Sequence, residues 1–387
     1  MRSVRQIPAF ANIPILVRTP LNVPIENGAV ADDYRLKKAL PTITFLAEHG
    51  AKVVLASHLG EKGTETLAPV AEALARFVPR TSFCPESTGP AARDAVRALS
   101  GGSVLVLENL RRNPGEVAND PAFAKELALL ADVFVQDSFD TCHRKHASIV
   151  ALPALLPAYA GLLLEEEVSE LSEALSPQHP ALAVIGGAKF ETKETVLETL
   201  LARYDHVFVG GALANDFLKA EGREIGASLA SPAADPAKLG ELLANPKLAL
   251  PVDVRALPAA AAADLDARAK ARVARADGVR ADETILDAGP ATEALLADLA
   301  GKARTILWNG PLGRYEAGFI DATDSLARAV AASGARSIVG GGDTVASIEN
   351  LGLIPRFSFV STGGGAMLDF LAEGTLPGLA ALNTTGL

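Results

Sequence analysis

Two lysines beside a pair of glycines are the residues whose types and spacing best suit a chemical task. The segment GGAKFETK places Lys189 and Lys193 four residues apart, and we expect both on one face of a helix that begins there. Two ammonium groups next to a glycine turn can neutralise a phosphoryl group during its transfer. Most lysine pairs are a solvated helix face, but the adjacent glycine loops favour the catalytic interpretation.

A carboxylate follows another run of glycines, in the segment VGGGDT. Asp343 comes directly after Gly340, Gly341 and Gly342. A lone carboxylate in that position can take Mg²⁺ together with phosphate oxygens. These residues predict a site for a magnesium-bound polyphosphate.

Five segments of the second half share one pattern, an apolar run that ends in glycines. They are VIGGAK, VGGALA, WNGPLG, VGGGDT and STGGGA. One such segment means little, because glycine commonly marks the turn after a strand. Five of them at the ends of parallel strands predict a ligand site, since ligands bind just outside those ends and helix N-termini attract phosphate. None is a Walker motif or a GxGxxG fingerprint, so we expect a nucleotide-type site assembled from scattered loops.

Cations occupy the corresponding places in the first half. Arg18, Arg35, His58, Arg111 and Arg144 follow predicted strands or lie at helix starts. Arginine suits bidentate binding of carboxylate or phosphate. The run HRKH that contains Arg144 adds two histidines, but no carboxylate or cysteine spacing completes a zinc site. The two halves together predict a two-lobed kinase that must close to react.

Short apolar runs alternate with stretches of helical period, and these elements would position the residues above. IPILVR, AKVVLAS, GSVLVLEN and DVFVQDS are typical of buried strands, whereas TLAPVAEALARFV, PAFAKELALLA and residues 33–50 are typical of helices. The alternation resumes in the second half. It predicts an α/β fold in which each domain has a parallel sheet flanked by helices.

The length of 387 residues is too great for one compact core, so two domains are expected. Residues 161–176 have apolar residues at helical spacing and end near SPQHP, the clearest boundary in the chain. We therefore expect one helix to join the two domains. The alanine-rich stretch 257–283 receives no structural assignment.

The charge distribution favours an anionic ligand in the first half. The net charge of −10 disfavours nucleic acid as a partner. Residues 1–160 carry 17 lysines and arginines against 16 acidic residues, whereas the remainder carries 19 against 30. The longest uncharged run is interrupted by Pro153 and Pro157, so we expect no membrane span. Two cysteines and an N-terminus without a signal-peptide core predict a cytoplasmic protein.

A series of motifs along the whole chain resembles the phosphoglycerate kinase family. In order they are RTPLNVP, ADDYRLKKALPTI, SHLG, LENLR, FDTCHRKH, LPAYAG, VIGGAKFETK, WNGPLGRYE, VGGGDT, STGGGA and LPGLAAL. The resemblance implies two Rossmann-like domains joined by a hinge helix. It also implies reversible phosphoryl transfer, in glycolysis and gluconeogenesis, between ATP and the carboxylate of 3-phosphoglycerate, giving 1,3-bisphosphoglycerate and ADP.

The resemblance also implies a division of labour along the chain. Residues 1–160 would bind the phosphorylated carboxylate, 161–178 would form the interdomain helix, and 179–370 would bind ATP or ADP with Mg²⁺. The tail, residues 371–387, would return to the N-terminal domain. A monomer is expected.

Individual roles carry over from the family at the matching positions. The catalytic residues would be Arg35, Lys189, Lys193 and Gly341. The substrate would contact Asn22, Arg35, His58, Arg111 and Arg144. The nucleotide would contact Lys193, Gly210, Gly211, Asn309, Glu316, Gly340, Gly341, Gly342, Asp343 and Thr344, with the ribose on Glu316 and the metal on Asp343.

Four positions depart from the family pattern. Pro20 replaces an aspartate that contacts the substrate hydroxyl, Glu61 replaces an arginine that helps hold the 3-phosphate, and Asp140 and Ala212 replace glycines. A carboxylate at position 61 would repel a phosphate. Either Lys62 has taken over the contact, with Glu61 turned to solvent or paired with Arg112, or the substrate carries no 3-phosphate.

Three functions follow from this pattern. The leading one is a working phosphoglycerate kinase with a drifted substrate loop. The second is a paralogue that forms an acyl phosphate on a different small carboxylate, because two substrate contacts changed together. The third is a nucleotide-binding protein without turnover, against which Arg35, Lys189, Lys193 and Asp343 argue.

Overall fold

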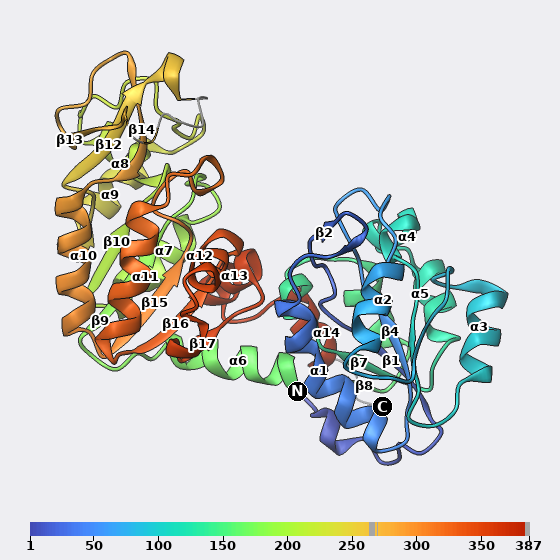
Figure 1. Ribbon diagram of the computed structural model, residues 1–387. Helices are drawn as coiled ribbons and strands as arrows, with labels where there is room; N and C mark the ends of the chain where they lie inside the picture. Colours follow the sequence, from blue (N-terminus) through green and yellow to red (C-terminus); the bar gives the residue numbers. More distant parts are fainter. Residues whose placement is uncertain (263–267, 269, 384–387) are drawn as a thin grey trace. The chain divides into compact units, whose positions relative to one another are not determined.

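The computed structural model describes residues 1–262, 268 and 270–383, and the chain divides into two compact units. Unit 1 contains Met1–Ser169 and the C-terminal segment from Thr375, and unit 2 contains Glu170–Gly374. Each unit is built on a six-stranded parallel sheet flanked by helices (Figure 1). The predicted fold class is confirmed.

The sheet of unit 1 has the strand order β5-β6-β4-β1-β7-β8. Its strands are β1 (Pro14–Arg18), β4 (Lys52–Ala56), β5 (Thr81–Phe83), β6 (Val104–Val106), β7 (Val133–Gln136) and β8 (Ala158–Ala160). The central strand β1 pairs in parallel with β4 and β7. Its residues from Ile15 to Arg18 are all buried, as expected for a strand covered on both faces.

Helices of unit 1 cover this sheet and shape the loops at its carboxyl edge. They are α1 (Tyr34–Glu48), α2 (Ala68–Ala75), α3 (Gly89–Ala98), α4 (Pro114–Val117), α5 (Pro121–Ala128) and α14 (Pro377–Asn383), with α6 (Leu162–Ala174) running into unit 2. Shorter pieces are the 3₁₀ turns η1 (Val4–Gln6), η2 (Leu110–Arg112), η3 (Phe139–Thr141) and η5 (Leu152–Ala154), the π-helical turn η4 (Ala147–Ala151) and the hairpin of β2 (Ile25–Glu26) with β3 (Ala29–Val30).

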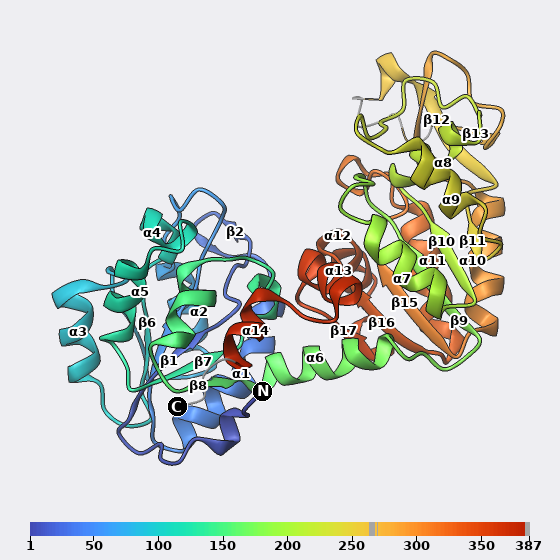
Figure 2. The same cartoon turned by 180° about the vertical axis from the view of Figure 1, so that it is seen from behind.

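One face of the unit 1 sheet forms a single apolar core with α1 and α2. Alternate residues of β1 and β4, such as Ile15 and Val53, pack with Ile43 of α1 and Leu74 of α2. This two-residue alternation against a helical stripe decides which side chains of each strand enter this core. The C-terminal helix α14 lies among the elements of unit 1 in both views (Figures 1 and 2), and Gly378 N–H donates to the Cys142 carbonyl at 2.8 Å.

The parallel sheet of unit 2 has the order β11-β10-β9-β15-β16-β17. Its strands are β9 (Ala181–Ile185), β10 (His206–Val209), β11 (Leu248–Ala249), β15 (Thr305–Asn309), β16 (Arg336–Gly340) and β17 (Phe359–Val360). All five strands predicted to run into glycines therefore belong to one sheet. Their glycine-bearing ends lie along one edge, because the strands are parallel.

Seven helices accompany the unit 2 sheet in the part of the chain that the structure describes. They are α7 (Glu194–Arg203), α8 (Leu213–Ala220), α9 (Pro236–Leu243), α10 (Pro290–Lys302), α11 (Asp321–Ser333), α12 (Gly342–Asn350) and α13 (Gly364–Glu373). In Figures 1 and 2, α10 and α11 cover one face of the sheet, and α7 and α13 cover the other. Among the described residues, no helix is both long and apolar enough to cross a membrane.

A second, antiparallel sheet in unit 2 overlaps the stretch that the sequence left without assignment, and its strand β13 lies wholly within it. It consists of β12 (Asp253–Pro258), β13 (Arg272–Arg275) and β14 (Glu283–Ala288), in the order β13-β12-β14. The strands are short and carry charged residues and alanines, so the local pattern does not indicate them. Residues 263–267 and 269 of that stretch, and 384–387 of the predicted tail, lie outside the described residues.

Candidate active site

The deepest cation of unit 1 is Arg18, at the carboxyl end of β1. Its side chain is 1 % exposed, and its Nη1 donates to the Thr19 carbonyl oxygen at 3.0 Å. Nη2 lies 3.0 Å from Nδ1 of His58, which follows β4 in the neighbouring loop. Burial, followed by the charges of Arg18 and Arg111, lowers the pKa of His58 well below its ordinary value. The imidazole is therefore neutral at physiological pH.

Three backbone and side-chain contacts fix the loop that follows His58. The Asn22 side-chain oxygen accepts from Gly60 N–H at 3.0 Å, and Arg111 Nη1 donates to the Gly60 carbonyl at 2.5 Å. Asn109 also closes the loop, because its Nδ2 donates to the Leu59 carbonyl at 2.7 Å. The predicted substrate residues Asn22, His58 and Arg111 thus meet at one loop, although they lie far apart in the sequence.

Arg35, near the start of α1, is tied to the same region. Its Nη1 donates to the Asn22 carbonyl at 3.0 Å and lies 3.9 Å from the Asp140 carboxylate. Asp140, in η3, also accepts from the Ser138 hydroxyl at 2.5 Å. The carboxylate that replaces a family glycine therefore faces the cation expected to act on the substrate.

The HRKH run contributes both exposed and buried groups. Arg144 is exposed, and its charge contributes to lowering the pKa values of His58 and Arg111. His146 is buried, and its pKa is lowered to about 4, mainly by burial and then by Arg144. All predicted anion-binding cations of unit 1 therefore influence one another, which is the arrangement that a polyanionic ligand would relieve.

The loop with Glu61 settles one of the options raised by the sequence. Glu61 and Lys62 are both exposed. Of the two placements left open for Glu61, the pairing with Arg112 is not among the described ion pairs, because Arg112 pairs with Glu108 at 3.0 Å. Glu108 is buried four residues earlier and also caps the loop through Leu67 N–H, so it is the better-placed partner. Glu61 is exposed, and its negative charge acts on Arg111 of the η2 turn.

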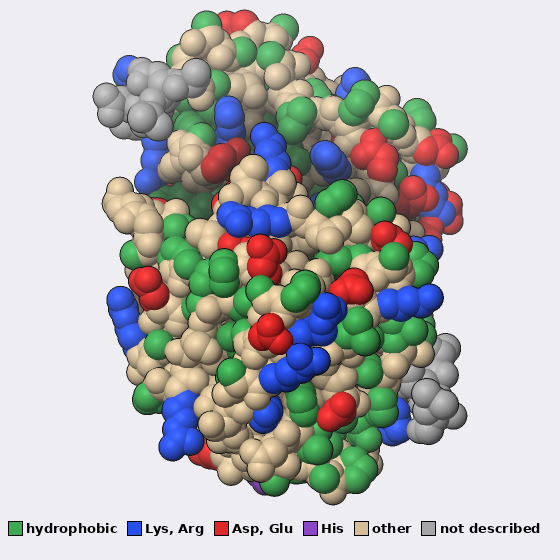
Figure 3. All heavy atoms as spheres, turned by 90° about the vertical axis from the view of Figure 1, so that its right-hand side faces the viewer, with side chains coloured by type: hydrophobic (Ala, Val, Ile, Leu, Met, Phe, Trp, Pro, Cys, Tyr) green, Lys and Arg blue, Asp and Glu red, His purple; other side chains and the backbone are tan. Residues whose placement is uncertain are grey.

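Pro20 is buried between Thr19 and Leu21, and its side chain offers no group that could bind a substrate hydroxyl. On the face of unit 1 that Figure 3 turns to the viewer, lysine and arginine are interspersed with acidic and apolar side chains. This face of unit 1 is therefore not uniformly basic.

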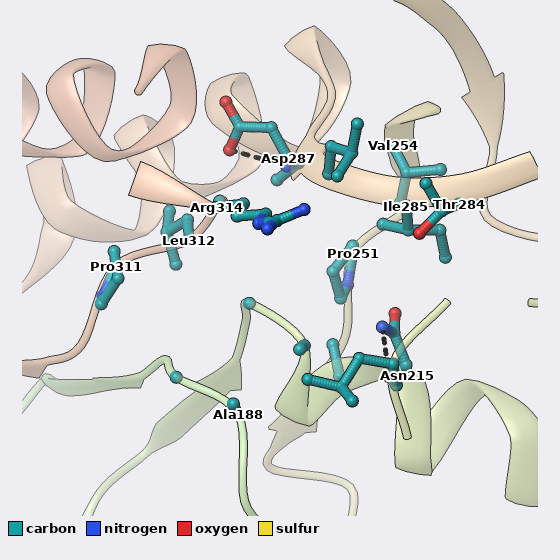
Figure 4. Close-up of a pocket in the computed structure, with 18 of the residues that line it drawn as sticks. Ala188, Asn215, Pro251, Val254, Thr284, Ile285, Asp287, Pro311, Leu312 and Arg314 are labelled. Carbon is teal, nitrogen blue, oxygen red and sulfur yellow. Dashed lines mark hydrogen bonds between the residues drawn. The ribbon is translucent and has the colours of Figure 1, made fainter. Parts of the chain in front are cut away.

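A cavity of about 720 Å³ lies in unit 2, between the glycine-ended loops and the antiparallel sheet. In Figure 4 the Arg314 side chain reaches into its middle, Thr284 and Ile285 of β14 lie on one side, and Asn215 of α8 lies on another. Its volume falls in the range of small-molecule sites. Among the predicted nucleotide residues, Gly211, Glu316 and Asp343 line it.

The two lysines do not share a helix face, so that prediction is wrong. Helix α7 begins at Glu194, with Lys193 as its N-cap residue and Lys189 in the preceding loop. The glycines of the β9 loop turn the chain before the helix can start. Lys193 nevertheless reaches the predicted place, because a methyl group on Gly187 would stand 3.2 Å from its Nζ. Partial burial, and then the charge of Lys189, lower the pKa of Lys193.

The turn from β16 to α12 presents backbone N–H groups at the edge of the sheet. Gly341, with φ of +102°, is the N-cap residue, a conformation that side chains rarely adopt. The first amides of the helix, from Gly342 to Thr344, precede its first internal hydrogen bond, from Val345 N–H to the Gly341 carbonyl. The Thr344 hydroxyl accepts from Gly310 N–H at 3.1 Å and ties this turn to the β15 loop.

Asn309, the last residue of β15, joins three loops. Its carbonyl accepts from Gly186 N–H at 2.8 Å, and its side-chain Nδ2 donates to the Gly364 carbonyl at 3.2 Å. At the neighbouring strand end, a methyl group on Gly211 would lie 2.8 Å from the Gly187 backbone, so these loops pack backbone to backbone. Ala212 departs from the family glycine without strain, because its φ is −66°.

Two carboxylates stand at one end of the cavity. Glu316, in the turn η8 (Tyr315–Ala317), is exposed and lies 3.4 Å from Arg314 Nε. Asp343 has its pKa raised, first by loss of solvent and then by the charge of Glu316. The described residues contain no group of three or more histidine, cysteine, aspartate or glutamate side chains that could hold a metal ion. Asp343 therefore fits a cation that arrives with phosphate oxygens as its other ligands.

Several residues that line the cavity of unit 2 or lie next to the cluster of unit 1 escaped the sequence analysis. In unit 1 they are Glu116 and Ser148, which contact each other beside Arg18, and in unit 2 they are Arg314, Asp287 and Asn215, which line the cavity. Arg314 lies in the motif WNGPLGRYE but received no role there, and the other four lie outside the motifs. The structure reveals them because it brings distant segments together.

Comparison with known proteins agrees with this geometry. The family described as phosphoglycerate kinase matches residues 4–374. A phosphoglycerate kinase of Thermus thermophilus is 46% identical over 380 residues, covering 95% of this chain and 96% of its own. One of Roseiflexus castenholzii is 44% identical over 384 residues, covering 95% of each chain.

The chain belongs to the phosphoglycerate kinase family. Solved phosphoglycerate kinases share its fold. The structure from Coxiella burnetii has a TM-score of 0.82 at 40% identity, covering 100% of this chain and 99% of its own. That from Pyrococcus horikoshii has a TM-score of 0.87 at 31% identity, covering 99% and 98%. The recognition made from the sequence motifs is confirmed.

Proposed function

We propose that this protein transfers a phosphoryl group reversibly between ATP and the carboxylate of 3-phosphoglycerate, as a glycolytic enzyme. Its family makes it a kinase, a phosphotransferase with a carboxyl group as acceptor. The cluster of arginines around the neutral His58 carries the choice of substrate. A non-phosphorylated acid would leave these positive charges undercompensated.

The acceptor needs no general base. A carboxylate is already ionised near neutral pH, so its oxygen can attack the γ-phosphoryl group of ATP directly. What the enzyme must supply is positioning and neutralisation of the charge on the transferring group. Both sites are rich in cations and backbone N–H groups and lack a paired nucleophile and base, which suits this chemistry.

In unit 1, we assign substrate binding to Asn22, His58, Arg111 and Arg144. Arg35 would neutralise the transferring group from the substrate side, because it extends from α1 toward the loop of Asn22. Two further cations follow the predicted substrate motifs: Lys62 is exposed in the loop after His58, and Arg112 of η2 is already paired with Glu108. Lys62 is therefore the cation that would take over the contact made by arginine in the family.

In unit 2, we assign the nucleotide to the cavity and the glycine-bearing edge of the sheet. Glu316 would hold the ribose, while Gly210, Gly211, Asn309 and the turn from Gly340 to Thr344 would surround the phosphates. Lys189 and Lys193 would neutralise the transferring group from the nucleotide side. Asp343 would hold Mg²⁺, which when bound neutralises charge on the phosphate oxygens.

The same proposal includes the setting of the enzyme. We place it in the cytoplasm, because both cysteines, Cys84 and Cys142, are free and buried, as in proteins of reducing compartments. We also propose that it acts as a monomer, since each of its two ligands is assigned to residues of a single unit.

A coupled assay tests the proposal directly. ADP formation is measured with MgATP and 3-phosphoglycerate, and in parallel with glycerate and other small hydroxy acids. Turnover with 3-phosphoglycerate and little with glycerate is expected. Turnover with glycerate in the absence of activity on 3-phosphoglycerate would refute the substrate assignment, and calorimetry that detects no MgADP binding would refute the nucleotide site.

A further inference from the structure

Glu116, a buried carboxylate of α4, is not a member of either site described above. Its side chain is 1 % exposed, and its oxygens accept from the Ser148 hydroxyl at 2.6 Å and from Ser148 N–H at 3.0 Å. A buried ionised carboxylate is costly unless its hydrogen bonds are satisfied and a cation is near. Ser148 supplies the hydrogen bonds, and the nearby cation contacts the other side of the same serine hydroxyl.

That cation is Arg18, which is buried with no carboxylate in direct contact among the described ion pairs. Its Nε donates to the Ser148 hydroxyl oxygen at 3.2 Å, so Ser148 bridges the guanidinium to Glu116. The charge of Glu116 is also the largest influence that favours the protonated form of Arg18, ahead of Asp140. The serine hydroxyl has one proton and donates it in the hydrogen bond to Glu116. Its oxygen lone pair therefore accepts the hydrogen bond from Arg18 Nε.

The other end of the Arg18 guanidinium fixes the protonation of His58. Nη2 of Arg18 lies 3.0 Å from Nδ1 of His58. A guanidinium can only donate hydrogen bonds, so Nδ1 must be the acceptor and cannot carry a proton. The ring is then the neutral tautomer with its proton on Nε2. Among the described hydrogen bonds none uses Nε2, which leaves this N–H for a ligand.

The surroundings of His58 disfavour its protonated form. Arg18 of β1, Arg111 of η2, Arg144 after η3 and Arg35 of α1 all act to lower its pKa. The acidic groups that face this cluster are Glu116, Asp140 and the exposed Glu61, which act on Arg18 and Arg111. His146, 3.9 Å from Glu116, is itself held neutral near pH 7 by burial and Arg144.

We propose that Glu116 is a positioning residue which, through Ser148 and Arg18, holds His58 in the tautomer that offers Nε2–H to the anionic substrate. The identity of the ligand rests on the proposed function, but the assignment of the His58 tautomer does not. His58 would thus bind the anion as a hydrogen-bond donor of fixed direction, and the arginines would supply the charge.

The direction of the change in anion affinity distinguishes a positioning role of Glu116 from a simple charge effect. If Glu116 acted only through its negative charge, its removal would strengthen the binding of an anion by the arginine cluster. If it positions Arg18 and His58, its removal weakens that binding, because the guanidinium loses its anchor and the imidazole its fixed tautomer. The two roles therefore predict opposite changes in KM.

The kinetic test compares Glu116→Gln with Asp137→Asn. Asp137 is a matched control, since it is a buried carboxylate of the same unit that accepts from the Leu163 and Leu164 N–H groups and makes no described hydrogen bond to the Arg18 side chain. We expect Glu116→Gln to raise the KM for 3-phosphoglycerate about fivefold to tenfold, with kcat within about twofold, as for a lost hydrogen-bonded anchor. We expect Asp137→Asn to leave that KM unchanged. A fall or no change in KM for Glu116→Gln overturns the proposal.

A spectroscopic test is independent of turnover. Long-range ¹H–¹⁵N correlation spectra of the wild-type protein, in buffer and with inorganic phosphate, should show His58 with Nδ1 unprotonated and Nε2 protonated from pH 5 to pH 8. In Glu116→Gln, or in Ser148→Ala if the first variant does not fold, a second tautomer or a protonated ring should appear in that range. A wild-type imidazolium at pH 6 to 7, or variants with unchanged spectra, would refute the proposed positioning. Failure of the 3-phosphoglycerate assay alone would instead refute the substrate.

Discussion

The two units hold their charged groups in different ways. In unit 1, Arg18, Arg35 and Arg111 are tied by hydrogen bonds to carbonyl oxygens, to serine or to histidine, and most of the cluster is buried. In unit 2, the described ion pairs include neither Lys193 nor Asp343, and the site is made chiefly by backbone at glycine turns. On the proposed assignments, one site is therefore fixed before its ligand arrives, whereas Lys193 and Asp343 would gain their charge partners with the ligand.

This difference indicates where substitutions act. A pre-fixed cluster transmits the loss of one member to its neighbours, so changes in unit 1 should appear as altered substrate binding. In a site of backbone amides and isolated charges, the loss of one group disturbs its neighbours little. A substitution in unit 2 should therefore affect only the kinetic step that uses the altered group. Four substitutions test this contrast.

The largest effect is expected for Lys193→Ala. Its ammonium would meet the phosphoryl group mainly during transfer, so kcat should fall by about 100-fold or more while the affinity for MgADP changes little. Steady-state kinetics and calorimetry measure the two quantities. Lys302→Ala removes an equal charge from the exposed surface of α10, where it pairs with Asp298, and serves as the control. Collapse of MgADP affinity with normal turnover of the bound enzyme would contradict the assigned role.

The next effect concerns Asp343, one of the two carboxylates that line the cavity. Asp343→Asn should weaken binding of ADP with Mg²⁺ by about tenfold, because one anionic ligand of the metal is lost. Binding of ADP in the presence of a chelator should change little, or tighten, since Asp343 and Glu316 then only repel the phosphates. Asp298→Asn is the matched control. An equal loss with and without metal would exclude Asp343 as the metal ligand.

A smaller effect is expected in the drifted loop of unit 1. Lys62→Ala should raise the KM for 3-phosphoglycerate about fivefold if this lysine has replaced the family arginine, since one charge contact at a solvated site is lost. Glu61→Arg should then change KM little, because Lys62 already makes the contact. Lys125→Ala, at an exposed position of α5, is the control. A strong improvement by Glu61→Arg, with no effect of Lys62→Ala, would show that the loop lacks a phosphate contact.

The smallest effect is expected for Asp140→Asn. The carboxylate lies 3.9 Å from Arg35 and competes with an anionic substrate for it, so removal of its charge should lower KM about threefold. The amide keeps the size of the side chain and can still accept from Ser138. A raised KM would mean instead that Asp140 holds Arg35 ready for the substrate. Either sign would distinguish competition from pre-positioning within the fixed cluster.

The sequence by itself determined the α/β class, because buried strands and helices have different apolar periods that survive in any context. It also indicated the glycine-bearing strand ends, since a run of β-branched residues followed by glycines is a local signal. The family motifs then supplied the candidate residues from Asn22 to Thr344. These features depend on neighbouring residues or on short spacings, and the sequence contains both.

Only the tertiary structure decided the contacts that depend on distant segments. It moved the start of α7 past Lys193, because the glycine turn after β9 delays the helix, and it formed the antiparallel sheet of β12, β13 and β14 from strands too polar to stand out. In the folded chain, Arg112 forms its ion pair with Glu108 and not with Glu61. The tertiary structure also joined Glu116, Ser148, Arg18 and His58, which come from four separate segments. Hydrogen bonds of this kind have no period in the sequence, because packing of the sheet and its loops brings their partners together.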